Sequence, residues 1–291
     1  MSGRNVADEV PGSAGRTVVL GPGGLVGTAW LAGLAAGLRH AGVDLGAADL
    51  IIGTSAGAIV GAALATGRDL DRLAILPARP GGPARRADPG QQAAVFAVLG
   101  DAGLDPVERL RRAGRLAVAA ETISEQRYIA QMEYLIGAHR WPSRRLLVPA
   151  VDIETGEPVI WDRAGEAPLP AAVASSTAFP GAAPPITVNG RRYMDGALRA
   201  GANLDLAEGA RVLVVLEPGA HMFGLAGEAS GDTAGPGGHP VVRIVPDPAA
   251  VEVFGPDLGD RSVWPAAYQA GRRQAAEAAG RARAAWRSAH R

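Results

Sequence analysis

The stretch Leu50-Ile51-Ile52-Gly53-Thr54-Ser55-Ala56-Gly57-Ala58-Ile59-Val60 decides the fold. An apolar run leads into a serine that lies between two glycines, Gly53 and Gly57, and a second apolar run follows. This order predicts a buried strand, a sharp turn and a helix. The glycines let the backbone turn tightly, so the Ser55 hydroxyl would stand where a substrate carbonyl can reach it. The pattern indicates a nucleophilic serine, and the alternative is a glycine-rich turn with a solvated serine.

The composition narrows the class of protein. The chain has 291 residues, of which 47% are hydrophobic, with 29 basic and 29 acidic residues and no net charge. Such a chain can bury a large core, and its alternation of apolar runs with helical patterns indicates an α/β protein. Balanced charge argues against a nucleic-acid partner, which would need a basic face. Lysine and cysteine are both absent, which excludes Schiff-base chemistry, disulfides and thiolate metal sites.

The chain divides into a tail, a core and an extension of the same domain. We expect a flexible tail at 1–15, a hydrolase core at 16–220 with an irregular cap or loop at 77–106, and a C-terminal extension at 221–291. The tail lacks the apolar centre of a signal peptide, so a cytoplasmic location is expected. Two uncharged stretches, 17–38 and 50–67, are long enough to span a membrane. Their glycines break them into strand, turn and helix, so no transmembrane segment is expected.

The other apolar runs predict the remaining elements. Strands are expected at 16–20, 50–52, 146–151, 158–161, 211–216 and 241–245. Helices are expected at 28–39, 56–65, 107–137, 170–176 and 264–290. A hairpin is expected over 186–194, because Asn189-Gly190 is typical of a tight turn between strands.

A glycine loop between the first strand and its helix is the candidate oxyanion site. In Gly21-Pro22-Gly23-Gly24-Leu25-Val26-Gly27, the amides of Gly23, Gly24 and Leu25 would lie at a helix N-terminus, where negative charge is favoured. Two successive strand–loop–helix units place this loop and the serine turn at the same edge of a parallel sheet. Gly27 supports the turn.

The same glycines also permit a dinucleotide site. That alternative needs an acidic residue at the end of the second strand to hold the ribose. Gly53-Thr54-Ser55 occupies that place and Asp49 lies before the strand, so a cofactor site is disfavoured.

The base that activates Ser55 has two kinds of candidate. His221 and His239 would fit the serine–aspartate–histidine order of α/β-hydrolases, although neither lies in a strong motif. Asp195 leaves the hairpin and is followed at once by Gly196 and Ala197, whose small size allows close approach to another backbone. The alternative for Asp195 is an ordinary Asp-Gly turn.

Together these motifs resemble one family, the bacterial patatin-like phospholipases. The resemblance runs from about residue 16 to about 216 and rests on three ordered blocks: 20–34, Gly53 to Gly57, and 174–205. The last block contains Ala174-Ser175-Ser176-Thr177-Ala178-Phe179-Pro180 and then Tyr193-Met194-Asp195-Gly196-Ala197. The chain departs from the family at Pro22 and Val26, which stand where the family has glycine and arginine. Asn203 corresponds to a family asparagine at a longer spacing.

The resemblance implies a fold and a chemistry. The fold would be a three-layer α/β/α sandwich with a mostly parallel sheet. The family uses a serine–aspartate dyad without histidine, which implies Ser55 as the nucleophile, Asp195 as the base and the Gly23–Gly24 amides as the oxyanion hole. It also implies a lipid or acyl-ester substrate, transient contact with a membrane surface, and neither cofactor nor metal. A serine–histidine–aspartate esterase and a non-catalytic lipid-binding protein stay as alternatives.

Overall fold

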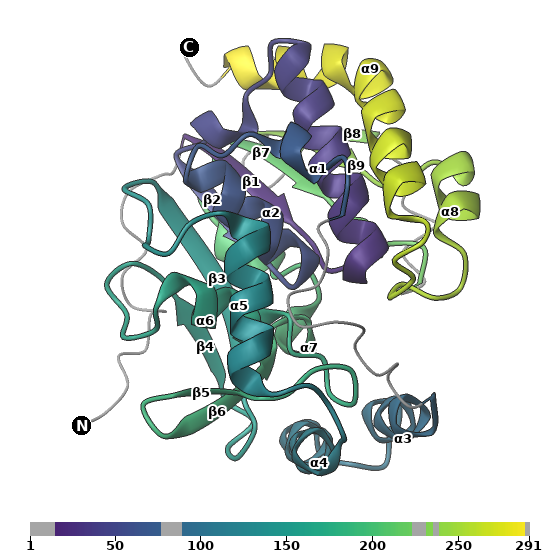
Figure 1. Cartoon of the computed structure of the whole chain (residues 1–291). Helices are drawn as coiled ribbons and strands as arrows, with labels where there is room; N and C mark the ends of the chain where they lie inside the picture. Colours follow the sequence, from purple (N-terminus) through teal and green to yellow (C-terminus); the bar gives the residue numbers. More distant parts are fainter. Residues whose placement is uncertain (1–14, 77–88, 223–230, 235–238, 289–291) are drawn as a thin grey trace.

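The computed structural model describes residues 15–76, 89–222, 231–234 and 239–288, and Figure 1 shows their arrangement. The strands are β1 (Arg16–Leu20), β2 (Leu50–Gly53), β3 (Arg145–Asp152), β4 (Pro158–Trp161), β5 (Ile186–Val188), β6 (Arg191–Asp195), β7 (Val212–Leu216), β8 (Gly231–Ala234) and β9 (Pro240–Ile244). The α-helices are α1 (Gly24–His40), α2 (Ala56–Ala65), α3 (Pro89–Leu99), α4 (Pro106–Ala119), α5 (Glu125–Ile136), α6 (Leu169–Ser176), α7 (Ala197–Ala200), α8 (Pro248–Phe254) and α9 (Trp264–Ser288).

One sheet joins all of these strands in the order β5-β6-β3-β2-β1-β7-β9-β8, with β4 paired to β3. The central strands β3, β2, β1, β7 and β9 run parallel, and the others are antiparallel. Leu20 pairs with Gly53 on one side and with Leu216 on the other. Three parallel strands therefore end at the same level, so the glycine loop, the serine turn and the segment after β7 meet at one edge of the sheet.

Helices cover both faces of this sheet, as the α/β/α prediction requires. The main core lies on the face covered by α1, α2, α5, α6 and α9. The opposite face carries smaller clusters, against which α4, α7 and a 3-10 helix at Leu204–Ala207 pack. Helices α1 and α9 pack almost backbone to backbone, because a Cβ atom at Gly33 would lie 2.0 Å from the Tyr268 carbonyl oxygen. The predicted fold class is confirmed.

Most predicted elements agree with the structure to within a few residues. The helix at 56–65, the hairpin and the pairing of 158–161 with the preceding strand are confirmed. The uncharged stretches form β1–α1 and β2–α2. Within the described part of the chain, no helix combines the length and the apolar character that crossing a bilayer requires.

Two predictions about 77–137 are wrong. The irregular segment contains helix α3, which starts at Pro89, because proline suits a first helical turn and no breaker follows Gly90 until Gly100. The single helix at 107–137 is two helices, α4 and α5, because Ser124 starts a new one by accepting from the Arg127 amide. Helices α7 and α8 and strand β8 were not predicted. Residues 1–14, 77–88, 223–230, 235–238 and 289–291 lie outside the described residues, so the predictions about the tail, about the start of the cap or loop and about these parts of the extension stay open.

Candidate active site

Ser55 lies in a strained turn between β2 and α2. Its backbone has φ 54° and ψ −117°, in the left-handed region that residues other than glycine rarely adopt. The surrounding structure holds this conformation, because the Ser55 amide donates to Ser176 Oγ at 3.1 Å and the Thr54 amide donates to the Leu20 carbonyl at 3.0 Å. Such strain persists only where neighbours enforce it, which is typical of functional turns.

Glycine is required beside this turn for reasons of space. A Cβ atom at Gly57 would lie 1.9 Å from the Leu20 carbonyl oxygen, and one at Gly53 would lie 2.5 Å from the Gly57 carbonyl oxygen. Both neighbours are backbone atoms, which cannot rotate away as a side chain can. The two motif glycines therefore allow the turn to pack directly against the end of β1.

The Ser55 hydroxyl donates to Asp195 Oδ2 at 2.8 Å. Asp195 ends β6, an antiparallel neighbour of β3, and its second oxygen Oδ1 accepts from the Ala197 amide at 2.8 Å. A Cβ atom at Gly196 would lie 2.1 Å from the Pro149 carbonyl oxygen, so this position also needs glycine. The two side chains are 140 residues apart in the sequence, and the sheet brings them together.

Burial controls the charge of Asp195. The side chain is 2% exposed, and loss of solvent raises the pKa of Asp195 to about 7, although the hydrogen bonds from Ala197 and Ser55 oppose this rise. A carboxylate with a pKa near neutrality is a stronger base than an exposed aspartate, whose pKa is about 3.9.

Asn203 joins the serine turn to the aspartate turn. Its fully buried Nδ2 donates to Thr54 Oγ1 at 3.0 Å and to the Gly196 carbonyl at 3.1 Å. Its Oδ1 accepts from Arg199 Nη1 at 2.8 Å. One amide side chain thus ties together the two backbone segments that carry Ser55 and Asp195, and it would fix the distance between them.

The glycine loop runs beside the serine turn. The Gly57 amide donates to the Gly21 carbonyl at 3.2 Å, which places the two loops in contact. Gly23 has no space for a side chain, since a Cβ atom there would lie 2.6 Å from Pro218 Cγ. Gly24 has a φ of +63°, and a Cβ atom there would lie 2.7 Å from the Leu258 carbonyl oxygen.

The amides of this loop differ in availability. The Leu258 carbonyl accepts from the Leu25 amide at 2.8 Å and from the Val26 amide at 3.2 Å. Leu25, a predicted oxyanion donor, is therefore already engaged in this arrangement. The amides of Gly23 and Gly24 donate to no other residue in the described part of the chain. These two amides are therefore the donors of the loop that are available to a ligand.

Among the described residues, the two candidate histidines have surroundings that do not include a bond to the serine or the aspartate. The ring of His221 packs against Phe254 with a centroid distance of 5.8 Å, and burial lowers the pKa of His221. His239 is exposed just before β9. Within the described ranges, neither histidine forms a hydrogen bond with Ser55 or Asp195. The same ranges contain no cluster of three or more His, Cys, Asp or Glu side chains that could hold a metal ion.

Sequence reasoning did not identify every contact at the site. Ser176 lies in the conspicuous stretch 174–180, but its contact with the Ser55 amide spans 121 residues. Leu258 and Pro218 lie in no motif. Leu258 contacts the glycine loop through its backbone carbonyl, and Pro218 contacts it through the edge of its ring. No local sequence signal could have assigned Leu258 or Pro218 to the site, and the contact made by Ser176 is evident only in the folded chain.

The chain is similar to one protein family and to a solved structure. A family model described as patatin-like phospholipase matches residues 18–208, a range that includes Ser55, Asp195 and the glycine loop. The crystal structure of VipD from Legionella pneumophila is similar at 15% sequence identity and a TM-score of 0.42, and the match covers 93% of this chain and 67% of that chain. No curated protein matches the sequence.

We expect Asp195→Asn to stabilise the folded protein at alkaline pH. The raised pKa means that the folded state prefers the protonated carboxyl, so stability falls as the pH rises from about 4 through about 7. The asparagine side chain stays neutral at every pH, so the variant does not lose this stability. Urea unfolding should show an advantage for the variant that grows by about 2 kcal/mol between about pH 5 and pH 8. An equal effect at both pH values would contradict burial as the cause.

We expect Gly57→Ala to abolish folding or to lower the free energy of unfolding by more than about 3 kcal/mol, because backbone must move to admit the methyl group. Gly280→Ala on α9 is the matched control, since nothing lies within 4 Å of its Cβ position. Better helix propensity should stabilise that control by up to about 1 kcal/mol. Thermal unfolding compares them, and a well-folded Gly57→Ala protein would contradict the packing described above.

Proposed function

The chain belongs to the patatin-like phospholipase family, and on this premise we propose that it hydrolyses acyl esters of lipids with Ser55 as nucleophile and Asp195 as base. Membership implies lipid acyl hydrolase activity. The observation that carries the assignment of residues is the 2.8 Å hydrogen bond from Ser55 Oγ to the buried Asp195 carboxylate.

In the first step, Ser55 Oγ attacks the ester carbonyl carbon while Asp195 Oδ2 accepts the hydroxyl proton. The carbonyl oxygen becomes negative as the tetrahedral intermediate forms. The amides of Gly23 and Gly24, at the N-terminus of α1, are the donors proposed to stabilise it. The absence of an arginine at position 26 leaves these backbone donors intact.

In the second step, the intermediate collapses and the bond to the leaving alcohol breaks. Protonated Asp195 gives its proton to the departing alkoxide, and the acyl group stays on Ser55 as an ester. Asp195 then takes a proton from water, which attacks the acyl-enzyme carbonyl. Collapse of the second intermediate returns that proton to Ser55 and releases the carboxylic acid.

The pKa of Asp195 supports its role as the base without a histidine. Proton transfer is most efficient when the pKa of the base is near the working pH, and burial brings Asp195 to about 7. The direct hydrogen bond removes the need for an intervening group. A serine–histidine–aspartate mechanism would require His221 or His239 to reach Ser55, and their described contacts lie elsewhere.

Active-site labelling tests the assignment. A fluorophosphonate should label the wild type, and Ser55→Ala and Asp195→Asn should each lose labelling and ester turnover, with a fall in kcat of at least about 1,000-fold. The double variant with alanine at His221 and His239 is the matched control and should keep both. Loss of activity in the histidine variant would support the triad instead. A wild type that neither labels nor turns over any ester would support a non-catalytic lipid-binding protein.

The pH dependence provides a second measurement. Because Asp195 must be ionised to accept the serine proton, kcat/KM should rise with pH and level off above the pKa of about 7. Below that value it should fall about tenfold per pH unit. A profile that is flat down to about pH 5 would contradict a buried carboxylate as the base.

A further inference from the structure

Helix α3 exposes an uncharged, apolar surface. No charged residue occurs between Pro89 and Gly100, and the exposed positions include Ala93, Ala94, Phe96 and Ala97. Phe96 is 55% exposed although it is a large aromatic residue. Most exposed helices carry charged residues on their outer face, so an uncharged surface of this kind is typical of an interaction site.

Helix α4 adds positive charge next to this apolar surface. The two helices pack against each other, and Figure 1 shows them at the end of the molecule away from α9. Arg111, Arg112 and Arg115 are exposed on α4, whereas Glu108 is the only acidic residue between Pro106 and Ala119. Val118, on the last turn of α4, is 47% exposed. Apolar side chains beside arginines are typical of segments that lie in a membrane interface.

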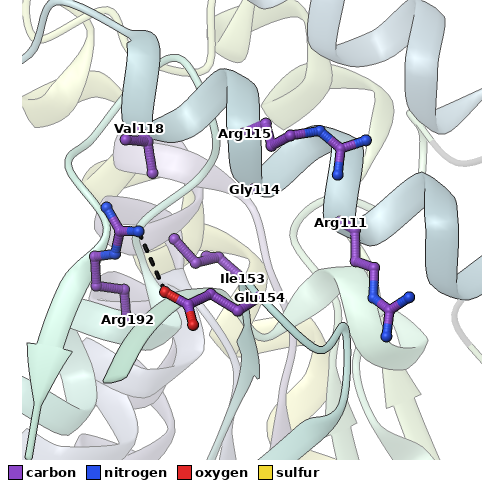
Figure 2. A pocket seen from close by; sticks show the side chains of 7 residues that line it. All are labelled: Arg111, Gly114, Arg115, Val118, Ile153, Glu154 and Arg192. Atoms are coloured by element: carbon purple, nitrogen blue, oxygen red, sulfur yellow. Dashed lines mark hydrogen bonds and ion pairs between the residues drawn. The ribbon is translucent and has the colours of Figure 1, made fainter. Parts of the chain in front are cut away.

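A pocket of about 350 Å³ opens beside α4. Figure 2 shows Arg111 and Arg115 on the helix and Arg192 across from them, with Ile153 and Val118 supplying apolar surface. Arg192 pairs with the exposed Glu154 at 3.3 Å. Arg111 donates through Nε to the Thr155 carbonyl and has no carboxylate partner in the described part of the chain. Arg115 pairs with Glu108 at 2.7 Å. Three guanidinium groups against two carboxylates leave the pocket with one net positive charge, which a phosphate group can neutralise.

This surface is connected to the proposed active site. The ring of Phe96 packs against Phe179 with a centroid distance of 5.5 Å. Phe179 follows Ala178, whose carbonyl accepts from the Asp195 amide at 3.0 Å. A surface that engages α3 would therefore lie next to the loop that holds Asp195.

We propose that the outer surface of α3 and α4 docks on a lipid bilayer that contains anionic phospholipid. Phe96 and Val118 enter the interface, and the pocket formed by Arg111, Arg115 and Arg192 takes a phosphate of a lipid headgroup. This inference rests on the proposed function, since docking here would deliver an acyl ester to Ser55. Opposite charge favours a bilayer over a second copy of the chain, whose same surface would also be positive.

Vesicle binding tests the docking without any turnover. Full-length Ser55→Ala protein is sedimented with vesicles of phosphatidylcholine, with and without phosphatidylglycerol. Binding should need the anionic lipid and should weaken as salt is raised. Replacing both Arg111 and Arg115 by alanine should weaken partitioning roughly 30-fold. The matched control removes two exposed arginines from α9, Arg273 and Arg287, and should bind like the parent protein.

Hydrolysis then separates docking from chemistry. In the Ser55-containing protein, the changes at Arg111 and Arg115, or Phe96→Ser, should slow hydrolysis of vesicle lipid and leave a short soluble ester unaffected. Equal binding to neutral and anionic vesicles, or equal loss in the α9 control, would overturn the docking proposal. So would self-association of the wild type that Phe96→Ser abolishes, because a second copy would then cover this surface. Failure to hydrolyse the soluble ester would count against the proposed function and leave the binding result standing.

Discussion

The site depends on backbone segments that approach one another more closely than side chains would permit. Leu20 lies against Gly57, and Pro149 lies against Gly196. A methyl group on Gly57 would come within 1.9 Å of the Leu20 carbonyl oxygen, and one on Gly196 within 2.1 Å of the Pro149 carbonyl oxygen. These contacts set the serine turn against the end of β1 and the aspartate turn against β3. The hydrogen bond between Ser55 and Asp195 follows from that packing, because each side chain extends from a backbone that cannot shift. Asn203 joins the two turns through its hydrogen bonds to Thr54 and Gly196.

Burial of Asp195 has two opposing effects, one on the stability of the fold and one on the basicity of the carboxylate. Removal from water weakens the folded state whenever the carboxyl is ionised, since among the described residues no cation neutralises it and only two donors contact it. The same removal brings its basicity toward neutrality. A histidine has this basicity in water, so an enzyme that uses histidine has less need to bury its base. The proposed use of Asp195 as the base therefore makes the chemistry depend on tight packing around the turn.

Local turns, helices and hairpins could be predicted from the sequence, whereas most contacts between distant residues could not. The turn at Ser55, the helix that follows it and the hairpin before Asp195 depend on neighbouring residues, and each is where the pattern placed it. The pairing of Ser55 with Asp195 was accessible only through a family resemblance. Ser176 and Leu258 reach the site across more than a hundred residues, and no sequence pattern indicated either contact. The engagement of the Leu25 amide by Leu258 shows that position in a motif does not establish that a donor is available.

The family-matched region ends at residue 208, yet the strands beyond it are part of the same sheet. Strand β7 pairs with β1 along its whole length, Pro218 packs against Gly23, and Leu258 caps the start of α1. A fragment cut at the family boundary would expose the unpaired edge of β1, a strand that is apolar on both faces. Such edges recruit other chains and cause aggregation. An expression fragment or a fusion junction should therefore be placed outside α9, and a sequence match alone is a poor guide to where this protein can be divided.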